Sequence, residues 1–157
     1  MLHDIEVTVN AQAYTMTIEP HRSLLWALRN QLGLVGAKEG CDDSECGACM
    51  VLVDGQLVNS CSYLAVQVAG RDVTTIEGLA QLPDMHPIQQ AFLAEGGVQC
   101  GFCTPGMIMA AKALLDRNPD PDDEAIRRGL AGNLCRCTGY QKIIRAVKVA
   151  AQTRQKG

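Results

Sequence analysis

Apolar and polar residues alternate over the first part of the chain, and this spacing predicts two β-strands. The apolar members form two runs separated by a short polar turn: Ile5, Val7 and Val9, then Tyr14, Met16 and Ile18. A period of two places one face of a strand against a core and the other in solvent. The chain is therefore predicted to begin with a β-hairpin.

A helix and further strands are predicted next. Four leucines between residues 24 and 32 share one helical face, and Ser23 is suited to cap that helix. Residues 50–53 are continuously apolar and predict a buried strand. Asp54-Gly55 is a strong hairpin signal that leads into Leu57 and Val58. Residues 73–76 are predicted to form the last strand.

The pattern changes near residues 78–86 and is helical after Pro83. A short helix is predicted over residues 87–95. Thr104 and Pro105 are suited to the N-cap and first turn of the next helix. Its apolar stripe then follows helical spacing from Met107 to Leu115.

Two more helices are predicted after the Asn118–Pro121 break. The first begins with acidic residues 122–124, at the positive end of the helix dipole. Thr138 and Gln141 form a capping-box pattern for the last helix, whose polar tail from Gln152 is expected to fray. Strands followed by helices predict an α+β fold.

Composition excludes several classes of protein. The chain has 157 residues and a net charge of −3, with no basic stripe that would favour a nucleic-acid partner. No apolar run is long enough to span a membrane, and no secretion signal stands at the N-terminus. We therefore expect a cytoplasmic protein whose cysteines stay reduced.

The eight cysteines fall into two groups of four. The first reads Cys41-x4-Cys46-x2-Cys49, with Cys61 following, and the second reads Cys100-x2-Cys103, then Cys135-x-Cys137. The first spacing is the one that plant-type ferredoxins use to hold a [2Fe-2S] cluster. The first group is predicted to lie on a glycine-bearing loop, and the second at the starts of two helices.

The residues around the cysteines suit an anionic cluster. Gly47 and Ala48 let backbone N–H groups approach sulfur, and such hydrogen bonds raise the reduction potential. Helix N-termini add partial positive charge near the second group. Arg136 either adds a charge there or is an ordinary surface residue.

Other interpretations of the cysteines are four disulfides or two zinc sites. The absence of a secretion signal disfavours disulfides. All-cysteine zinc sites favour paired Cys-x2-4-Cys segments, which the first group, a triplet plus one cysteine, does not provide. The second group contains an unfavourable Cys-x-Cys pair, but its spacing alone leaves zinc open as an alternative. His3, His21 and His86 are isolated, and Asp42, Asp43 and Glu45 look like a solvated rim.

Three segments resemble the signatures of one family, the small iron–sulfur subunit of the xanthine dehydrogenase family of molybdenum hydroxylases. The segments are Gly40-Cys-Asp-Asp-Ser-Glu-Cys-Gly-Ala-Cys49, Gln99-Cys-Gly-Phe-Cys-Thr-Pro-Gly106 and Gly132-Asn-Leu-Cys-Arg-Cys-Thr-Gly-Tyr140. Together and in this order they are highly specific, and the resemblance covers nearly the whole chain.

The resemblance implies an N-terminal β-grasp, plant-type ferredoxin-like domain over residues 1–77 and an all-α four-helix domain over residues 78–157. It implies an outer cluster held by Cys41, Cys46, Cys49 and Cys61, and an inner cluster held by Cys100, Cys103, Cys135 and Cys137. Gln99 and Cys137 would approach the pterin of the molybdenum cofactor. Ser44 departs from the glycine that many relatives carry there, although some have serine.

The resemblance also implies the function of an electron-transfer subunit with no catalytic residue or substrate site of its own. Electrons would pass from a molybdenum-cofactor large subunit through the inner and then the outer cluster to a subunit carrying FAD, in a heterotrimer or a dimer of heterotrimers. We expect an N-heteroaromatic substrate such as xanthine or nicotinate. The alternatives are an aldehyde, carbon monoxide or aromatic acyl-CoA oxidoreductase of the same family. A free-standing ferredoxin-like carrier and a zinc-stabilised interaction module also remain to be distinguished.

Overall fold

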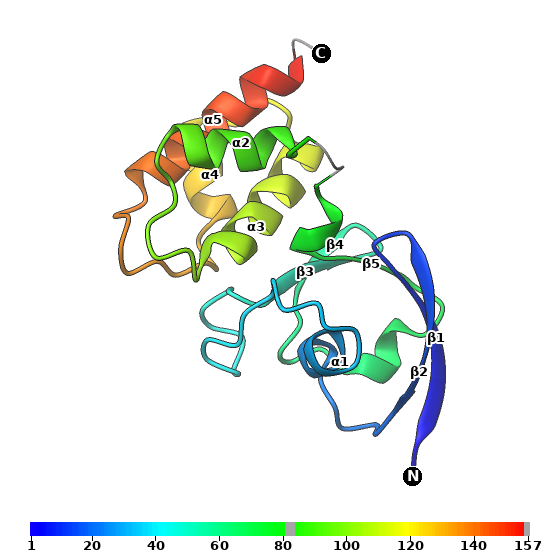
Figure 1. Ribbon diagram of the computed structural model, residues 1–157. Helices are drawn as coiled ribbons and strands as arrows, with labels where there is room; N and C mark the ends of the chain where they lie inside the picture. Colours follow the sequence, from blue (N-terminus) through cyan, green and yellow to red (C-terminus); the bar gives the residue numbers. More distant parts are fainter. Residues whose placement is uncertain (81–83, 156–157) are drawn as a thin grey trace.

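The strands and helices are segregated along the chain, as the periodicity predicts. The computed structural model describes residues 1–80 and 84–155. A five-stranded sheet with the order β2-β1-β5-β3-β4 occupies the first half, and helices α2 to α5 follow it (Figure 1). Pro83, after which we predict the helical pattern, lies outside the described residues.

The predicted first hairpin is confirmed by β1 (His3–Val9) and β2 (Gln12–Ile18), which pair in antiparallel register with Ile5 opposite Met16. The turn uses Asn10 and Ala11, both with left-handed backbones at φ 52° and 64°. Strand β1 also pairs in parallel with β5 (Asp72–Thr74), so the hairpin joins the rest of the sheet.

The second predicted hairpin is formed by β3 (Met50–Val53) and β4 (Gln56–Asn59). Asp54 and Gly55 make its turn with φ values of 48° and 76°, the conformation that tight hairpins prefer. The last strand, β5, begins at Asp72, one residue earlier than predicted. It ends at Thr74, before its predicted end, because Ile76 starts a 3-10 turn, η2 (Ile76–Gly78).

Strand β3 is buried on both faces, which explains its continuously apolar sequence. Val51 and Val53 belong to the core on the α1 side of the sheet. Leu52, which points to the opposite face, belongs to the core of the helical half. The sheet therefore separates two cores, and β3 contributes to each of them.

Helix α1 (Leu24–Asn30) lies inside the curve of the sheet (Figure 1). Ser23 caps it as predicted, because its hydroxyl accepts the N–H of Trp26 at 3.1 Å. The helix ends two residues before its predicted end at Leu32, and the left-handed Gly33 (φ 68°) follows. A short 3-10 helix, η1 (Ala65–Val68), packs beside it.

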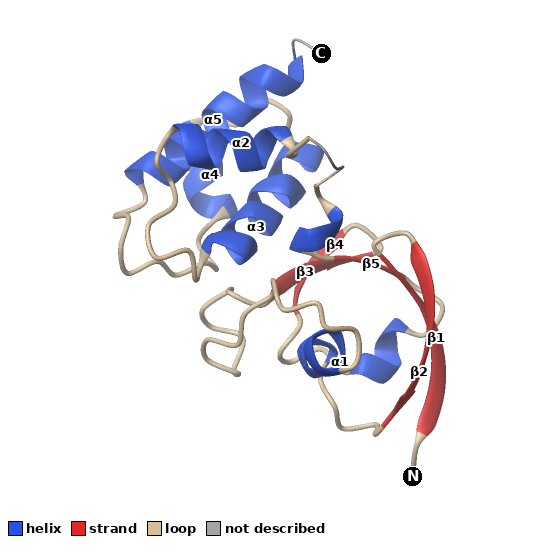
Figure 2. Ribbon diagram, viewed as in Figure 1, coloured by secondary structure: helices blue, strands red, loops and turns tan. Residues whose placement is uncertain are grey.

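The helical half consists of α2 (Pro87–Ala94), α3 (Thr104–Arg117), α4 (Asp123–Gly129) and α5 (Gln141–Gln155), shown in blue in Figure 2. Helix α3 is buried over most of its length because it packs against β3 as well as against α2 and α4. The predicted acidic start of α4 is confirmed, and Asp122 accepts the N–H of Ala125 at 2.7 Å. None of the helices in the described ranges is long and apolar enough to cross a membrane.

Two predicted helix caps are wrong. Thr104 is the first residue of α3 rather than its cap, which is Cys103, and the Thr104 hydroxyl is buried with no hydrogen-bond partner among the described residues. Helix α5 begins only at Gln141, so Thr138 lies outside it. Gly139 and Tyr140 have φ values of 63° and 68°, and left-handed residues cannot continue a right-handed helix back to Thr138.

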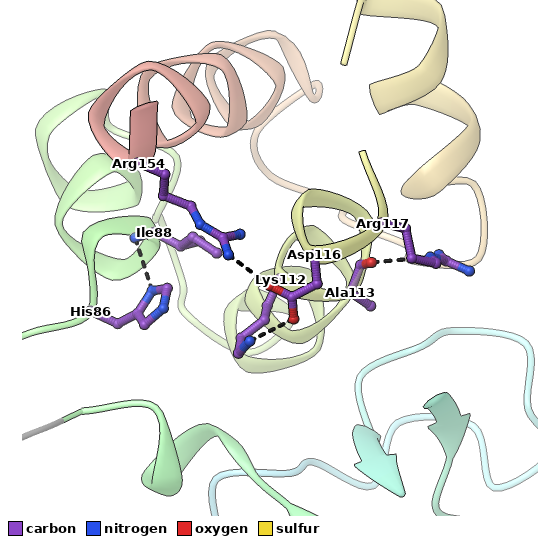
Figure 3. Close-up of polar contacts among 7 residues, drawn as sticks. All are labelled: His86, Ile88, Lys112, Ala113, Asp116, Arg117 and Arg154. Atoms are coloured by element: carbon purple, nitrogen blue, oxygen red, sulfur yellow. Dashed lines mark hydrogen bonds and ion pairs between the residues drawn. The ribbon is translucent and has the colours of Figure 1, made fainter. Parts of the chain in front are cut away.

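The predicted fraying from Gln152 is also wrong, because α5 continues to Gln155. Figure 3 shows the contact that holds its last turn: Arg154 Nη2 lies 2.9 Å from Asp116 Oδ1 on α3. The other carboxylate oxygen of Asp116 accepts a hydrogen bond from Lys112 at 2.6 Å. Burial raises the pKa of Asp116, but these two cations outweigh burial and hold it below its usual value.

Candidate metal centres

The first cysteine group lies on the loop between α1 and β3, with Cys61 just after β4. This loop contains three left-handed residues, Asp42, Ser44 and Gly47, with φ values of 59°, 68° and 70°. A Cβ at Gly40 would lie only 2.7 Å from Cys46 Sγ, so glycine leaves room for that sulfur. The acidic side chains of the loop are exposed, which confirms the predicted solvated rim.

The thiols of the first group come together in pairs. The N–H of Cys46 donates to Cys41 Sγ at 3.4 Å. Cys49 and Cys61 are adjacent and buried, with exposed fractions of 2% and 8%. Burial, together with the neighbouring thiol of Cys61, raises the pKa of Cys49 to about 11. A bound metal would have to displace that proton, because metals bind the thiolate.

Side chains from β4 and the residues after it fix this loop. Asn59 Nδ2 donates to the carbonyl of Ser44 at 3.1 Å, and the buried Ser60 hydroxyl donates to the carbonyl of Cys49 at 2.6 Å. The Ser44 hydroxyl lies 3.9 Å from Cys61 Sγ. The backbone at Ser44 is left-handed at φ 68°, a conformation that glycine adopts without strain.

The second group gathers four thiols from two loops. Cys100 and Cys103 precede α3, and Cys135 and Cys137 precede α5. Burial first, then the adjacent thiol of Cys135 and the charge of Cys100, raises the pKa of Cys103 to about 12. The pKa of Cys137 is raised by its neighbours Cys100 and Cys135. Cys103 therefore lies beside Cys135, and Cys137 beside Cys100.

A hydroxyl that the sequence analysis assigned to a helix cap instead contacts this group. Thr138 Oγ1 donates to Cys135 Sγ at 3.0 Å. Burial raises the pKa of Cys135, but this hydrogen bond and backbone N–H groups outweigh burial and lower it. Tyr140 supports the same loop, since its hydroxyl accepts the N–H of Cys135 at 2.8 Å and donates to the carbonyl of Asn133 at 3.2 Å.

One edge of the second group is open to solvent. Cys100 and Cys137 are exposed, and so is the neighbouring Gln99. Two large apolar side chains next to the other two cysteines of the group are exposed: Phe102, before Cys103, at 48% and Leu134, before Cys135, at 57%. Arg136 is exposed as well, in agreement with its interpretation as a surface residue.

The two cysteine-bearing regions touch each other directly. The N–H of Leu134, next to Cys135, donates to the carbonyl of Cys46 at 2.9 Å. Asn133 Nδ2 donates to the carbonyl of Gly47 at 3.2 Å. A Cβ on Gly47 would lie 2.3 Å from the carbonyl oxygen of Gly132, so the backbones approach as closely as glycine permits.

The donor sets fit clusters of two irons. Each group offers four thiols, and the first brings them together as two pairs, which matches the two thiolates per iron of a [2Fe-2S] cluster. Within residues 1–80 and 84–155, no three or more His, Cys, Asp or Glu side chains converge as ligands of a single metal ion. Cys41 thus lies beside Cys46 and Cys49 beside Cys61, and the roles of all eight cysteines as ligands stay predictions.

Fold and cysteine groups together define a protein with a ferredoxin-like domain and a helical domain, each suited to a [2Fe-2S] cluster. Two family models match the chain accordingly. The model described as "2Fe-2S iron-sulfur cluster binding domain" matches residues 7–76. The model described as "[2Fe-2S] binding domain" matches residues 75–148.

Similar proteins extend over almost the whole chain. The nicotinate dehydrogenase small FeS subunit of Eubacterium barkeri is 49% identical over 94% of this chain and 94% of its own. The nicotine 6-hydroxylase small subunit of Paenarthrobacter nicotinovorans is 45% identical over 92% of this chain and 87% of its own. The xanthine dehydrogenase iron-sulfur-binding subunit of Escherichia coli O157:H7 is 47% identical over 96% of this chain and 95% of its own. The chain therefore belongs to the small iron–sulfur subunits of the xanthine dehydrogenase, or molybdenum hydroxylase, family.

Solved structures agree with the fold. A chain of quinoline 2-oxidoreductase from Pseudomonas putida 86 superposes with a TM-score of 0.95 at 40% identity, covering 99% of this chain and 98% of that one. The aldehyde oxidoreductase from Desulfovibrio gigas superposes with a TM-score of 0.94 at 43% identity, where this chain covers 17% of the larger one. The same fold thus occurs as a separate chain and as part of a longer one.

Proposed function

We propose that this chain is the electron-transfer subunit of a molybdenum-containing oxidoreductase, and that it relays electrons from a molybdenum-cofactor large subunit to a flavin subunit. The observation that carries this proposal is the contact between the two cysteine-bearing regions. One backbone hydrogen bond, from Leu134 to Cys46 at 2.9 Å, links a cysteine of the first group to the residue beside Cys135 of the second. A [2Fe-2S] cluster, when bound, supplies single-electron chemistry.

The chain's own contribution is to hold two centres and to set their surroundings. We propose that the first centre is held by Cys41, Cys46, Cys49 and Cys61, and the second by Cys100, Cys103, Cys135 and Cys137. The pairing of thiols supports these assignments. No residue of the chain is assigned a catalytic role.

The proposed direction of electron transfer is based on which of the two cysteine groups is exposed to solvent. Cys137 and Gln99 are exposed at one edge of the second group, which supports their proposed approach to the pterin of the large subunit. The first group would then face the flavin subunit. A surface cleft of about 270 Å³ beside Cys61, lined by Trp26 and Arg29 among others, gives a partner access to that site.

For the substrate we propose an N-heteroaromatic compound such as nicotinate or xanthine, oxidised on the large subunit. The names of similar proteins support this class, since they include nicotinate and xanthine dehydrogenases and a quinoline oxidoreductase. An aldehyde is the second candidate, because the aldehyde oxidoreductase of Megalodesulfovibrio gigas is 45% identical over 92% of this chain. Carbon monoxide and aromatic acyl-CoA oxidoreductases remain further alternatives.

The organisation we propose is a heterotrimer or a dimer of heterotrimers in the cytoplasm. The boundary between the two domains is proposed at residues 77 and 78, supported by the end of the last strand at Thr74 and the meeting of the two family models at residues 75–76. Eight unpaired cysteines support a reducing compartment.

The proposal is tested by iron and acid-labile sulfide analysis of the purified chain, followed by electron paramagnetic resonance after reduction. We expect about four irons and four sulfides per chain and two distinct signals. Zinc without labile sulfide would indicate the zinc-stabilised module instead. Purification from the native host separates the remaining alternatives: a large molybdenum-containing partner supports the electron-transfer subunit, whereas a lone stable chain supports a free carrier.

A further inference from the structure

The hydroxyl of Thr138 makes the shortest hydrogen bond to a cysteine sulfur in the described part of the chain. Its Oγ1 lies 3.0 Å from Cys135 Sγ. The N–H of Cys46 reaches Cys41 Sγ at 3.4 Å, and the Ser44 hydroxyl lies 3.9 Å from Cys61 Sγ. Thr138 is therefore the side chain that interacts most directly with the sulfur of Cys135, a proposed ligand of the second site.

The surroundings of Thr138 direct its proton toward the sulfur. The N–H of Tyr140 donates to Thr138 Oγ1 at 3.3 Å, so the oxygen already serves as an acceptor on that side. Its own hydrogen is then free to point at Cys135 Sγ. The consecutive left-handed residues Gly139 and Tyr140 separate Thr138 from helix α5, so its hydroxyl does not cap that helix.

Tyr140 also holds the backbone on either side of Cys135. Its hydroxyl accepts a hydrogen bond from the N–H of Cys135 at 2.8 Å and donates one to the carbonyl of Asn133 at 3.2 Å. Hydrogen bonds therefore link Tyr140 to residues 133, 135 and 138, and they orient the Thr138 hydroxyl. This network lies at the start of α5 but forms no part of that helix.

We propose that Thr138 is a positioning residue that raises the reduction potential of the second [2Fe-2S] site through its hydrogen bond to Cys135 Sγ. The inference rests on the proposed function, since it requires that Cys135 is a ligand. One-electron reduction adds negative charge that the ligand sulfurs share, and a donor to sulfur stabilises the reduced form more than the oxidised form. The hydroxyl thus makes this site a better electron acceptor.

The test is a redox titration of the full-length protein, followed by the paramagnetic signal of each site. Thr138→Val removes the hydroxyl while keeping the shape of the side chain, and Thr138→Ser keeps the hydroxyl. At a fixed ambient potential, we expect the reduced-to-oxidised ratio of the second site to fall roughly three- to tenfold in Thr138→Val. Thr138→Ser should retain most of the wild-type ratio, and the first site should not change in either variant.

A matched control is Thr153→Val, which removes a hydroxyl from α5 that donates to the carbonyl of Val149. An unchanged ratio in Thr138→Val, with both signals present, would overturn the proposal. If Thr138→Val loses the second signal, Thr138→Ala is titrated instead, and loss of the signal there too would show that the hydroxyl holds the site rather than tuning it. Absence of iron and labile sulfide from the wild-type chain would refute the proposed function itself, which keeps the two failures distinct.

Discussion

Single residues in left-handed conformations shape the first cysteine loop. Ser44 has a φ of 68°, in a region that costs residues with a Cβ about 1–2 kcal/mol. Its hydroxyl lies near Cys61 Sγ, and its carbonyl accepts a hydrogen bond from Asn59. The strain at this position is therefore offset by local hydrogen bonds that hold the loop around the thiols.

Ser44→Val should destabilise the loop, because a β-branched side chain tolerates a positive φ poorly and cannot donate to sulfur. We expect the free energy of unfolding to fall by about 1–2 kcal/mol beyond the cost that serine already carries, because a β-branched residue is more strained at positive φ, and we expect reduced iron content. Ser44→Gly is the matched control and should change stability by less than about 1 kcal/mol, because glycine adopts this conformation freely. Thermal unfolding and iron analysis measure both effects. Equal losses in the two variants would show that the backbone conformation does not matter.

The grouping of the cysteines was predictable from spacing, but the roles of the hydroxyls were not. Thr138 and Gln141 match a capping box in sequence, yet two left-handed residues intervene and exclude Thr138 from the helix, and its hydroxyl donates to Cys135 Sγ instead. Thr104 similarly looked like a cap and is the first residue of α3. Which partner a short polar side chain finds depends on backbone dihedrals that a spacing rule does not contain.

Packing between elements depends on a few positions where backbones meet. A Cβ on Gly106 of α3 would lie 2.1 Å from the carbonyl oxygen of Gly47, so α3 could not keep its place against the first cysteine loop. Strand β3 reinforces this arrangement, because its Leu52 is buried in the helical core. The elements of the two domains therefore pack as parts of one structure.

Gly106→Ala should lower the free energy of unfolding by about 1–3 kcal/mol, because the clash is with backbone that cannot move aside. Gly129→Ala is a matched control in α4, where the new Cβ would meet the flexible end of Leu114 at 2.9 Å. We expect that variant to stay within about 1 kcal/mol of wild type. Calorimetry of both variants tests this, and similar unfolding temperatures for the two would contradict the packing argument.

His86 makes the attachment of α2 sensitive to pH. Its Nδ1 accepts the N–H of Ile88 at 3.2 Å, a role that requires the neutral ring (Figure 3). Burial, then the positive charges of Lys112 and Arg154, lowers the pKa of His86, while Asp116 opposes them. The unfolded chain takes up the proton first, so this contribution is full above about pH 6.5 and declines as the pH falls.

The free energy of unfolding should therefore decrease as the pH is lowered from 7.5 to 5. His86 should account for about 0.5 kcal/mol of this decrease, after allowance for its partial exposure. His86→Asn keeps a side-chain acceptor at the cap without titrating in this range. That variant should show a smaller decrease when denaturant unfolding is compared at the two pH values. An identical decrease in both proteins would assign the pH dependence to other groups.

The secondary-structure elements were largely predictable because they follow periodicity. Both hairpins, the burial of β3 and the stripe of α3 follow from apolar spacing, whereas α4 is predicted from its acidic first turn. The length of α5 was not predictable, because its last turn depends on Arg154 reaching Asp116, 38 residues away in the chain. Long-range ion pairs of this kind leave no local signature in a sequence.

At the scale of the whole molecule, two centres are predicted to be held by separate halves that share one interface. Cys137→Ser should remove the signal of the second site and leave that of the first largely intact, and Cys46→Ser should do the reverse. The expectation follows from the separate ligand groups, each carried by its own set of elements. Electron paramagnetic resonance of the reduced variants measures it. Loss of both signals in either variant would show that the interface through Leu134 and Cys46 makes the centres mutually dependent.

The unequal exposure of the thiols has a consequence for how such a protein is assembled. Cys49 and Cys61 are 2% and 8% exposed, so these two thiols of the first group are covered by their own chain, whereas Cys100 and Cys137 of the second group lie open. A docked partner that covers this edge would also block the route by which iron and sulfide arrive. In the proposed assembly, the second site would be filled before docking, and until docking oxygen and chelators would reach it at this open edge.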